Sequence, residues 1–471
     1  MDAVVRNSIP KRVDGYVRVP RSMQAPTFLD GNFLASRCYS NSLSLWALRL
    51  PDRLDFSALQ EAFVHLFQQY PTIGCDLFNG CWEEALLKPD NVISHSDLRG
   101  IDAESVLPKI LTKIMLQDVN PAAAPHLRAA LMTLDDSDLL VLRSAHTPVD
   151  GYTMRWLMAR LAANYSTLVA GQPMPPAPVT LSAYDALSGI YLRSAYDSAV
   201  VAESLNLRTR FSTEMWAARQ PLNFAESEGG QPGFVRLALS QESVQQLKLA
   251  RVKSCTLNDQ LLATLILAMR NTEGVKGGPE VKIAIPADMR RYVRGNQLVL
   301  GNLASVTSLR VQVSEGDGYT DVLNKVSKAQ LKAKSIGIGL PEILCLPTIA
   351  APDNFMLNQL ERFNQDQLRR GLTGQVFSNS GSLDRSQFKF GDVVPTEILS
   401  LPAIPRCPGA INAGCYGYDG KLYVGFPVND DRPSSPLYRL ANTWRTMLFA
   451  AMSNPDRGEI TIDDGVKLTV R

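Results

Sequence analysis

The chain has 471 residues, more than a single hydrophobic core usually supports, so the length predicts two lobes. Hydrophobic residues make up 45% of the chain and charged residues 20%, and the formal net charge is +2 with no block of like charge. This balance is typical of a soluble globular protein, and it gives no electrostatic support to a nucleic-acid or anionic-membrane partner.

The cysteine pattern and the apolar runs further narrow the class of protein to which the chain can belong. Seven cysteines are scattered along the chain without a C-x-x-C pair. We therefore expect reduced thiols, and neither a disulfide framework nor a metal site. The first 16 residues hold no signal-peptide apolar core, and runs such as "LLATLILAM" are far too short to span a membrane. A cytoplasmic protein without a membrane span is expected.

The first half of the chain alternates strand and helix patterns. Residues 42–50 predict a strand, and residues 54–71 carry apolar residues at helical spacing. Ser57 and Gln60 predict a capping box at the start of that helix, and Pro71 predicts its end. A second helix is predicted over 103–119 and a buried strand over 138–146. His65 and His126 are interpreted as structural.

A proline-rich stretch at 170–185 predicts an extended linker, and 224–233 is a second soft segment with a helical pattern between the two. We place the boundary between lobes in this region. The predicted units are residues 1–180, a linker and helical segment at 181–225, and residues 226–471.

The second half again mixes both kinds of element. Strands are predicted at 234–240, 303–313 and 421–428, and residues 281–292 predict a strand that runs into a loop. Helices are predicted at 241–255 and 256–271, and "FSNSGSL" predicts a turn-rich segment after a strand. Thr256 and Asp259 are spaced as a capping pair. The order is not a strict βα repeat and contains no Gly-rich phosphate loop, which favours an α+β sandwich in each lobe over a dinucleotide fold.

The stretch "RSAHTPVDGYTMRW" contains the candidate catalytic residues. His146 follows a strand pattern, and Pro148 disfavours a helical conformation at the residue before it. A helix is predicted to begin just after Gly151, so residues 147–150 form a turn. An imidazole at a strand end can take a proton from a hydroxyl or amine, and Gly151 lets a substrate approach the backbone. Asp150 could hold the loop by pairing with a buried cation. The alternative is a hydrogen-bonded structural histidine at a strand end.

"HTPVDG" resembles the active-site motif of the condensation-domain and acyltransferase superfamily. That superfamily includes nonribosomal peptide condensation domains, plant and fungal BAHD acyltransferases, polyketide-associated acyltransferases and alcohol acetyltransferases. Further segments are similar to this group in the same order and cover most of the chain: "ALQEAFVHLFQQYPTI", "TLNDQLLATLILAMR", "IPADMRRYVRGNQLVLGN" and "FSNSGSL" followed by "FKFGDV".

The resemblance implies two chloramphenicol-acetyltransferase-like lobes that meet in a V-shaped pseudo-dimer, with a tunnel between them and His146 at its middle. It implies that His146 deprotonates a small-molecule alcohol or amine acceptor, which then attacks a thioester. The thioester would be acyl-CoA, or an acyl chain on the phosphopantetheine of a separate acyl or peptidyl carrier protein. No tightly bound cofactor is implied, and a monomer is expected because one chain supplies both halves of the site.

The same resemblance implies roles for other residues. Asp150 would be structural and would pair with Arg290, with the adjacent Arg291 as the alternative. Thr153 would supply an oxyanion donor, or else cap the helix. Ser378 and Asn379 would line the tunnel, or else form a polar turn.

The chain also departs from its relatives. Ala145 stands where peptide condensation domains carry a second histidine, and "KFGDV" stands where BAHD enzymes carry Asp-Phe-Gly-Trp-Gly. The first difference favours a stand-alone acyltransferase over a peptide-forming domain, and the second indicates that the chain is not a standard plant-type BAHD enzyme. We expect a stand-alone acyltransferase that makes an ester or amide in specialised metabolism. The alternatives are a stand-alone condensation enzyme that needs a carrier-bound donor, and a non-catalytic homologue that binds thioesters.

Overall fold

The structure is a computed structural model. It describes residues 12–470 except 14–15, 118–119, 212–218, 222, 225–230, 251–253, 273–274, 277–278, 408 and 453–465. Parts of the predicted helical segment after residue 211 and of the soft segment at 224–233 therefore lie outside the described residues.

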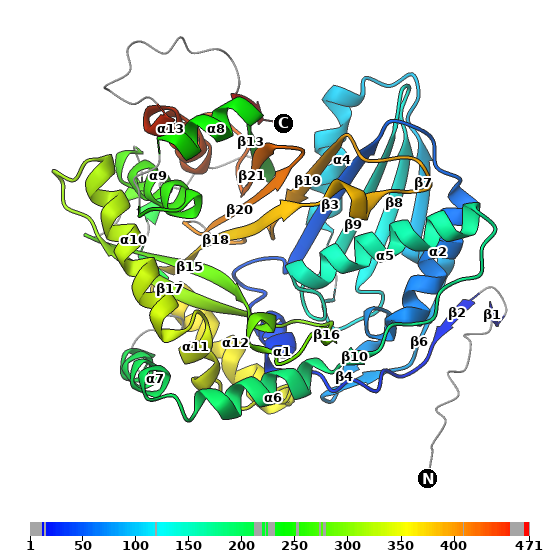
Figure 1. Cartoon of the computed structure of the whole chain (residues 1–471), viewed down its shortest axis with the longest axis horizontal. Coiled ribbons are helices and arrows are strands. Elements are labelled where there is room, and N and C mark those ends of the chain that lie inside the picture. The colour runs from blue at the N-terminus through cyan, green and yellow to red at the C-terminus, as the bar shows by residue number, and fades with distance from the viewer. Residues whose placement is uncertain are drawn as a thin grey trace.

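Within the described residues, five strands form a first sheet in the order β19-β3-β9-β8-β7 (Figure 1). Their bounds are β3 Leu43–Leu50, β7 Ile93–Asp97, β8 Leu127–Thr133, β9 Asp138–Ala145 and β19 Glu397–Leu401. Neighbouring strands are antiparallel except β7 and β8. Every residue of β9 is buried, because helices cover both faces of this sheet.

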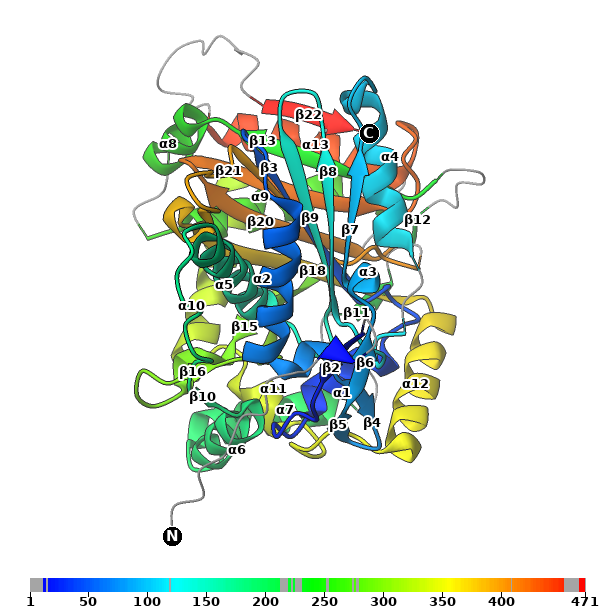
Figure 2. The same cartoon turned by 90° about the vertical axis from the view of Figure 1, so that its right-hand side faces the viewer.

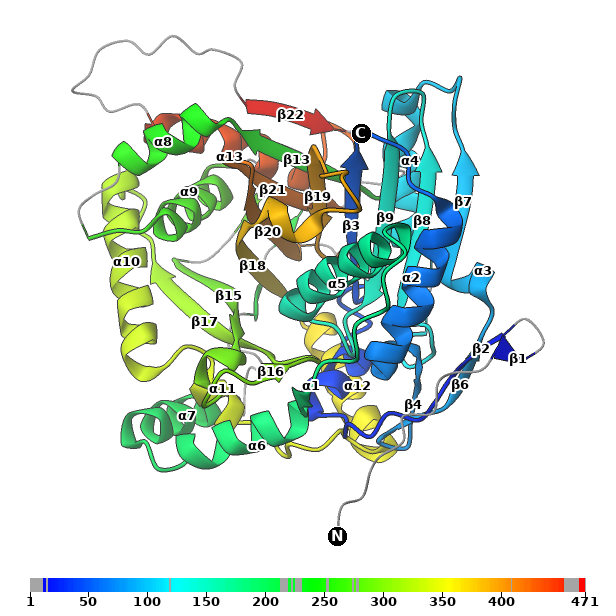
Figure 3. The ribbon, with the colours of Figure 1, turned by 45° about the vertical axis from the view of Figure 1, so that its right-hand side comes forward.

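Three helices cover the first sheet: α2 (Phe56–Gln69), α4 (Ala103–Leu116) and α5 (Gly151–Val169). Helices α2 and α5 pack side by side on one face (Figure 3), whereas α4 lies against the other face (Figure 2). The apolar stripe predicted for 54–71 is buried, and α2 ends before Pro71. The predicted Ser57 cap is wrong: Asp55 caps α2 by accepting from the Ala58 amide at 2.9 Å.

The described residues form a second, eight-stranded sheet in the order β17-β15-β18-β20-β21-β13-β22, with β11 also pairing with β18. These strands are β11 Arg219–Pro221, β13 Gly233–Leu239, β15 Glu280–Asp288, β17 Ala304–Gln312, β18 Leu372–Leu383, β20 Ile411–Tyr418, β21 Lys421–Val428 and β22 Val466–Val470. The helices packed on its outer side are α8 Gln241–Leu249, α9 Leu257–Asn271, α10 Tyr319–Ile336 and α13 Pro436–Met452 (Figure 1). The predicted capping box of Thr256 and Asp259 is present at the start of α9.

The remaining elements lie outside the two sheets and the helices named so far. Among them, α1, α6, α7, α11 and α12 lie together in the lower part of the molecule as drawn in Figure 1. The helices are α1 Phe28–Ala35, α3 Pro89–Val92, α6 Ala183–Ser194, α7 Ser198–Phe211, α11 Leu340–Leu344 and α12 Asn354–Arg369, with short 3-10 turns η1 Pro71–Gly74, η2 Met289–Tyr292 and η3 Arg385–Phe388. The short strands are β1 Arg12–Val13, β2 Tyr16–Val19, β4 Asp76–Phe78, β5 Cys81–Glu83, β6 Ala85–Leu87, β10 Thr180–Leu181, β12 Asn223–Phe224, β14 Val275–Lys276 and β16 Leu298–Val299.

The fold is α+β, as predicted, but the second half of the chain is not confined to the second sheet. Strand β19 belongs to the second predicted unit but pairs with β3, so the first sheet contains strands from both predicted units. The segment "FSNSGSL" is also not a turn. It continues β18, with a register shift between Asn379 and Ser382 where Gly381 adopts a φ of 70°.

In the described part of the chain, no helix is both long enough and apolar enough to cross a membrane.

Candidate active site between the two sheets

The connection from β9 to α5 places the His146 motif. The His146 amide donates to the Ser42 carbonyl at 2.8 Å, which extends the pairing of β9 with β3 by one residue. Asp150 caps α5 and accepts from the Thr153 amide at 2.9 Å. The helix therefore begins at Gly151 itself, one residue earlier than the sequence pattern indicates.

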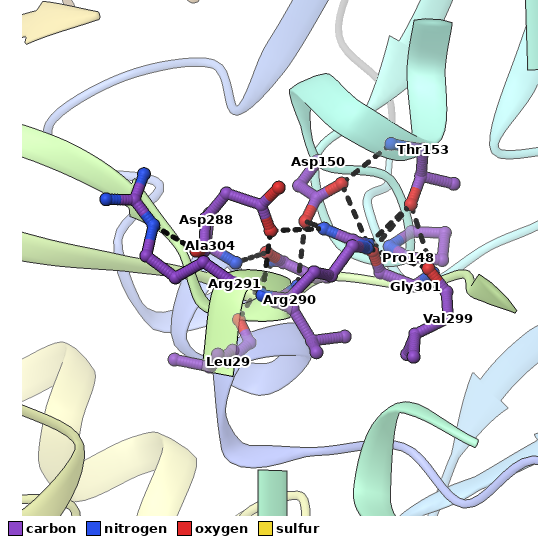
Figure 4. A network of polar contacts seen from close by, with 12 residues as sticks. Leu29, Pro148, Asp150, Thr153, Asp288, Arg290, Arg291, Val299, Gly301 and Ala304 are labelled. Carbon is purple, nitrogen blue, oxygen red and sulfur yellow. Dashed lines mark hydrogen bonds and ion pairs between the residues drawn. The ribbon is translucent and has the colours of Figure 1, made fainter. Parts of the chain in front are cut away.

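Asp150 forms a bidentate ion pair with Arg290, which comes from the η2 turn after β15 (Figure 4). The two contacts are 2.7 and 3.2 Å, and the side chains are 3% and 9% exposed, respectively. Burial alone would raise the pKa of Asp150, but the charge and hydrogen bonds of Arg290 hold it below its ordinary value. Arg291 instead donates to the Asp288 carbonyl at an exposed position, so Arg290 is the partner.

Thr153 belongs to this ion-pair network and not to a substrate surface. Its side chain is fully buried, and its hydroxyl donates to the Gly301 carbonyl at 2.7 Å. The same oxygen accepts from Arg290 at 2.9 Å and from the Gly301 amide at 3.1 Å. Both interpretations of Thr153 are therefore wrong: its proton is already donated, and the helix cap is Asp150.

The His146 ring lies flat against Phe33 of α1, with the ring centroids 4.0 Å apart and an interplanar angle of 13°. Its Nδ1 is buried without a well-formed hydrogen bond, so Nε2 is the nitrogen available to a ligand. Burial lowers the pKa of His146, while interactions with its own backbone and with the charge of Asp150 oppose that shift. At neutral pH the imidazole is therefore unprotonated and can accept a proton.

Asn302 fixes the backbone of the histidine. Its side-chain amide is fully buried and donates to the His146 carbonyl at 3.0 Å, and to the carbonyls of Thr147 and Leu29 at 3.4 Å. One side chain thus ties the His146 turn to α1 and to the segment between β16 and β17.

His146 lines a cavity of about 370 Å³ between the two sheets. Most of the lining is apolar or small, and it includes serines from β3, β17, β18 and β19. Gly374, Val376, Ser378 and Ser380 face the cavity from alternate positions of β18. Asn379 lies between two of them and points away, donating to Asn258 at 3.0 Å, so its predicted place in the lining is wrong.

A sequence profile described as the condensation domain matches residues 28–389, more than half of the chain. The chain belongs to the condensation-domain family.

Solved structures of this family share the fold. The first condensation domain of CDA synthetase has 17% identity and a TM-score of 0.64, covering 94% of this chain and 100% of its own. A variant of the starter condensation domain of rhizomide synthetase RzmA, in complex with C8-CoA, has 16% identity and a TM-score of 0.63 over 92% of this chain and 95% of its own. SgcC5 from Streptomyces globisporus has 16% identity and a TM-score of 0.63 over 90% and 98%. No curated protein sequence matches the chain.

Three residues of this condensation-domain site were missed in the sequence. Asn302 stands in the quoted "GN" segment, so a signal for it existed. Phe33 and Glu342 reach the cavity from α1 and α11, and nothing local in the sequence marks them. Among the described residues no cluster of histidine, cysteine and carboxylate side chains could hold a metal ion.

We expect Asn302→Ala to lower the free energy of unfolding by about 2–3 kcal/mol, because it leaves buried carbonyls without a donor. Urea unfolding measures this. Asn296→Ala is the matched control, since Asn296 follows a glycine in the same segment but is exposed. Equal effects of the two substitutions would contradict the role given to Asn302.

We expect Phe33→Ala to raise the pKa of His146 toward its ordinary value, because the ring that excludes water from the imidazole is removed. Titration of the histidine ring resonances by NMR measures this. Phe355→Ala removes a phenylalanine that is 73% exposed and should leave the His146 titration unchanged. An unaltered His146 pKa in Phe33→Ala would show that Phe33 does not desolvate the ring.

Proposed function

We propose that this condensation-domain protein is a stand-alone acyltransferase that moves an acyl group from a thioester to an alcohol or amine, with His146 as general base. The observation that carries the proposal is the His146 imidazole in the wall of the cavity between the sheets, kept neutral by burial and backed by Phe33. Because Nδ1 is buried, Nε2 is the base.

In the proposed reaction, Nε2 takes the proton of the acceptor O–H or N–H as the acceptor atom attacks the thioester carbonyl carbon. The tetrahedral intermediate collapses with cleavage of the carbon–sulfur bond. The thiolate takes the proton back from the imidazolium, which leaves a free thiol, an ester or amide, and neutral His146.

The oxyanion donor that this reaction needs is assigned to the Gly151 backbone amide in place of Thr153. Gly151 is the first residue of α5, so its amide has no acceptor within the helix and lies at the positive end of the helix dipole. It also lines the cavity, and a Cβ at this position would meet nothing within 4 Å. A substrate carbonyl can therefore approach this amide closely.

Asp150, Arg290 and Asn302 are positioning residues in this proposal. Asp150 and Arg290 are hydrogen-bonded to each other and to the backbone of the segment around Gly301. Asn302 donates to the backbone of the His146 turn. Ser378 contributes to the surface along which the substrate lies. In the same proposal the units 1–180 and 226–471 are two lobes that meet in a V, and a monomer carries a whole site.

The proposed donor is acyl-CoA or an acyl phosphopantetheine thioester, with no tightly bound cofactor. Variants of the RzmA starter domain were solved with C8-CoA, and with C8-CoA and Leu-SNAC together. These complexes support the proposal that a protein of this fold binds a thioester donor. SgcC5 was solved with a naphthyl ethanediol, which supports an alcohol as acceptor. A carrier-bound donor remains the alternative, because the CDA synthetase domain belongs to a synthetase.

We expect His146→Ala to lower acceptor-dependent thiol release by roughly 10²–10⁴-fold, because the general base is lost. The measurement uses acyl-CoAs from short to long chains with pooled alcohols and amines. His95→Ala removes an exposed histidine on β7 and should retain full activity.

If no acyl-CoA is used, the same acyl chains are supplied on phosphopantetheinylated carrier proteins. His146-dependent turnover there would establish the carrier-dependent form of the reaction. Full activity of His146→Ala with a productive substrate pair would contradict the proposed base. Thioester binding without turnover from either donor would favour the non-catalytic alternative.

A further inference from the structure

A carboxylate stands in the cavity wall apart from the His146 turn. Glu342 lies on α11 and lines the cavity with Ser308 of β17, and among the described lining residues it is the only carboxylate. Its Oε1 accepts from the Ser308 amide at 3.4 Å, while its Oε2 is buried without a hydrogen-bond partner among the described groups. The Ser308 hydroxyl is buried and unpartnered in the same way.

The backbone that carries Glu342 is held against β17. The Ser305 hydroxyl donates to the Gly339 carbonyl at 3.0 Å, and the Gly339 amide donates to the Thr307 hydroxyl at 2.7 Å. Gly339 has a φ of 81°, and a Cβ there would lie 2.9 Å from the Met289 sulfur. The carboxylate is therefore part of a packed wall, and it does not sit on a loop that could carry it out to water.

The charges around Glu342 leave it unneutralised. Burial raises its pKa to about 7; hydrogen bonds from its own backbone and the Ser308 amide oppose this shift, and the charge of Glu203 on α7 adds to it. The other titratable groups that interact with it are Tyr292 of η2 and Cys345 of α11. Arg208 of α7 donates to the Leu344 carbonyl at 2.5 Å, and no ion pair of Glu342 is found among the described residues.

Glu342 Oε2 and the Ser308 hydroxyl, both without a partner in the cavity wall, match the chemistry of an ammonium group. An ammonium carries three N–H donors and a positive charge, so it can satisfy both Oε2 and the Ser308 oxygen and neutralise the carboxylate. A ligand hydroxyl can donate to Oε2 and accept from Ser308, but it has no charge to neutralise the carboxylate. Buried polar groups left unpaired in a native structure call for such a partner.

We propose that Glu342 and Ser308 form a subsite that binds a protonated amine of the substrate, away from the bond that His146 helps to form. This subsite rests on the acyl-transfer function proposed for the same cavity, although its binding can be tested without turnover. The amine belongs to the acyl donor or to the acceptor, and its chemistry is the same in both cases.

The test compares the binding of n-hexylamine and 1-hexanol to the full chain by calorimetry at pH 8, where the amine is protonated and Glu342 is ionised. We expect at least a roughly tenfold preference for hexylamine. This preference should vanish in Glu342→Gln and, in the unmodified chain, at pH 5.5, where Glu342 is protonated. It should persist in Glu203→Gln, which removes a neighbouring carboxylate outside the cavity lining.

The Glu342→Gln variant is expected to fold. A carboxyl with a raised pKa in the folded state contributes stability below its unfolded pKa and loses that contribution as the pH rises through about 7. At pH 8, Glu342→Gln should therefore have a thermal midpoint no lower than that of the unmodified chain. A clearly lower midpoint would show that Glu342 is a structural residue and would overturn the subsite.

Further binding measurements show whether the amine belongs to the donor or to the acceptor, and they separate the subsite from the proposed acyl transfer. Preferential binding of 6-aminohexanoyl-CoA over hexanoyl-CoA places the amine on the donor, and preferential binding of 6-aminohexan-1-ol over 1-hexanol places it on the acceptor; both must depend on Glu342. His146→Ala should retain the hexylamine preference. The subsite therefore stands even if His146 proves not to be the general base. Absence of any preference in the unmodified chain, or its survival in Glu342→Gln, would overturn the subsite.

Discussion

The buried ion pair between Asp150 and Arg290 is the interaction on which the arrangement of the site depends. Asp150 ends the His146 turn and caps α5, whereas Arg290 follows β15 of the second sheet. Arg290 also donates to the carbonyls of Val299 and Gly301, so the pair fastens the first-sheet motif to the segment between β16 and β17. Two charges buried this deeply are favourable only as a pair with every hydrogen bond made, and this requirement fixes their geometry.

In the proposed reaction, that constraint explains how a single histidine is prepared for proton transfer. The turn between β9 and α5 exposes Gly151 and the Nε2 side of His146 to the cavity, while Asn302 and Phe33 hold the rest of the residue in place. Burial shifts the imidazole toward its neutral form, and the nearby negative charge of Asp150 opposes that shift. Because Arg290 is paired with Asp150, this opposition is weaker than an unpaired carboxylate would give. Small side chains from both sheets then leave room for a substrate beside a fixed base.

The sequence predicts what is local, and it misses what comes together across the fold. The strand pattern before His146 places that residue at a strand end, and the spacing of Thr256 and Asp259 predicts the cap of α9. The family resemblance implies Arg290 as the partner of Asp150. The resemblance implies an oxyanion role for Thr153, but its hydroxyl is taken up by Gly301 and Arg290, which no local pattern reveals. The resemblance places both Ser378 and Asn379 in the tunnel wall, but neighbouring residues of a strand point to opposite faces, so Ser378 reaches the cavity and Asn379 does not. Phe33, Glu342 and the pairing of β19 with β3 depend on contacts between segments that are distant in the sequence, which no local pattern encodes.

A double-mutant cycle on Asp150→Asn and Arg290→Met tests the central claim most directly, with urea unfolding and thiol release as its two measurements. Each single substitution should lower the free energy of unfolding by about 3–5 kcal/mol and reduce thiol release, because each leaves a buried charge or turn without its partner. The account predicts that the double variant is less destabilised than the sum of the singles by about 2 kcal/mol or more. Strictly additive losses, or full activity in either single variant, would contradict the claim that this pair holds the site together.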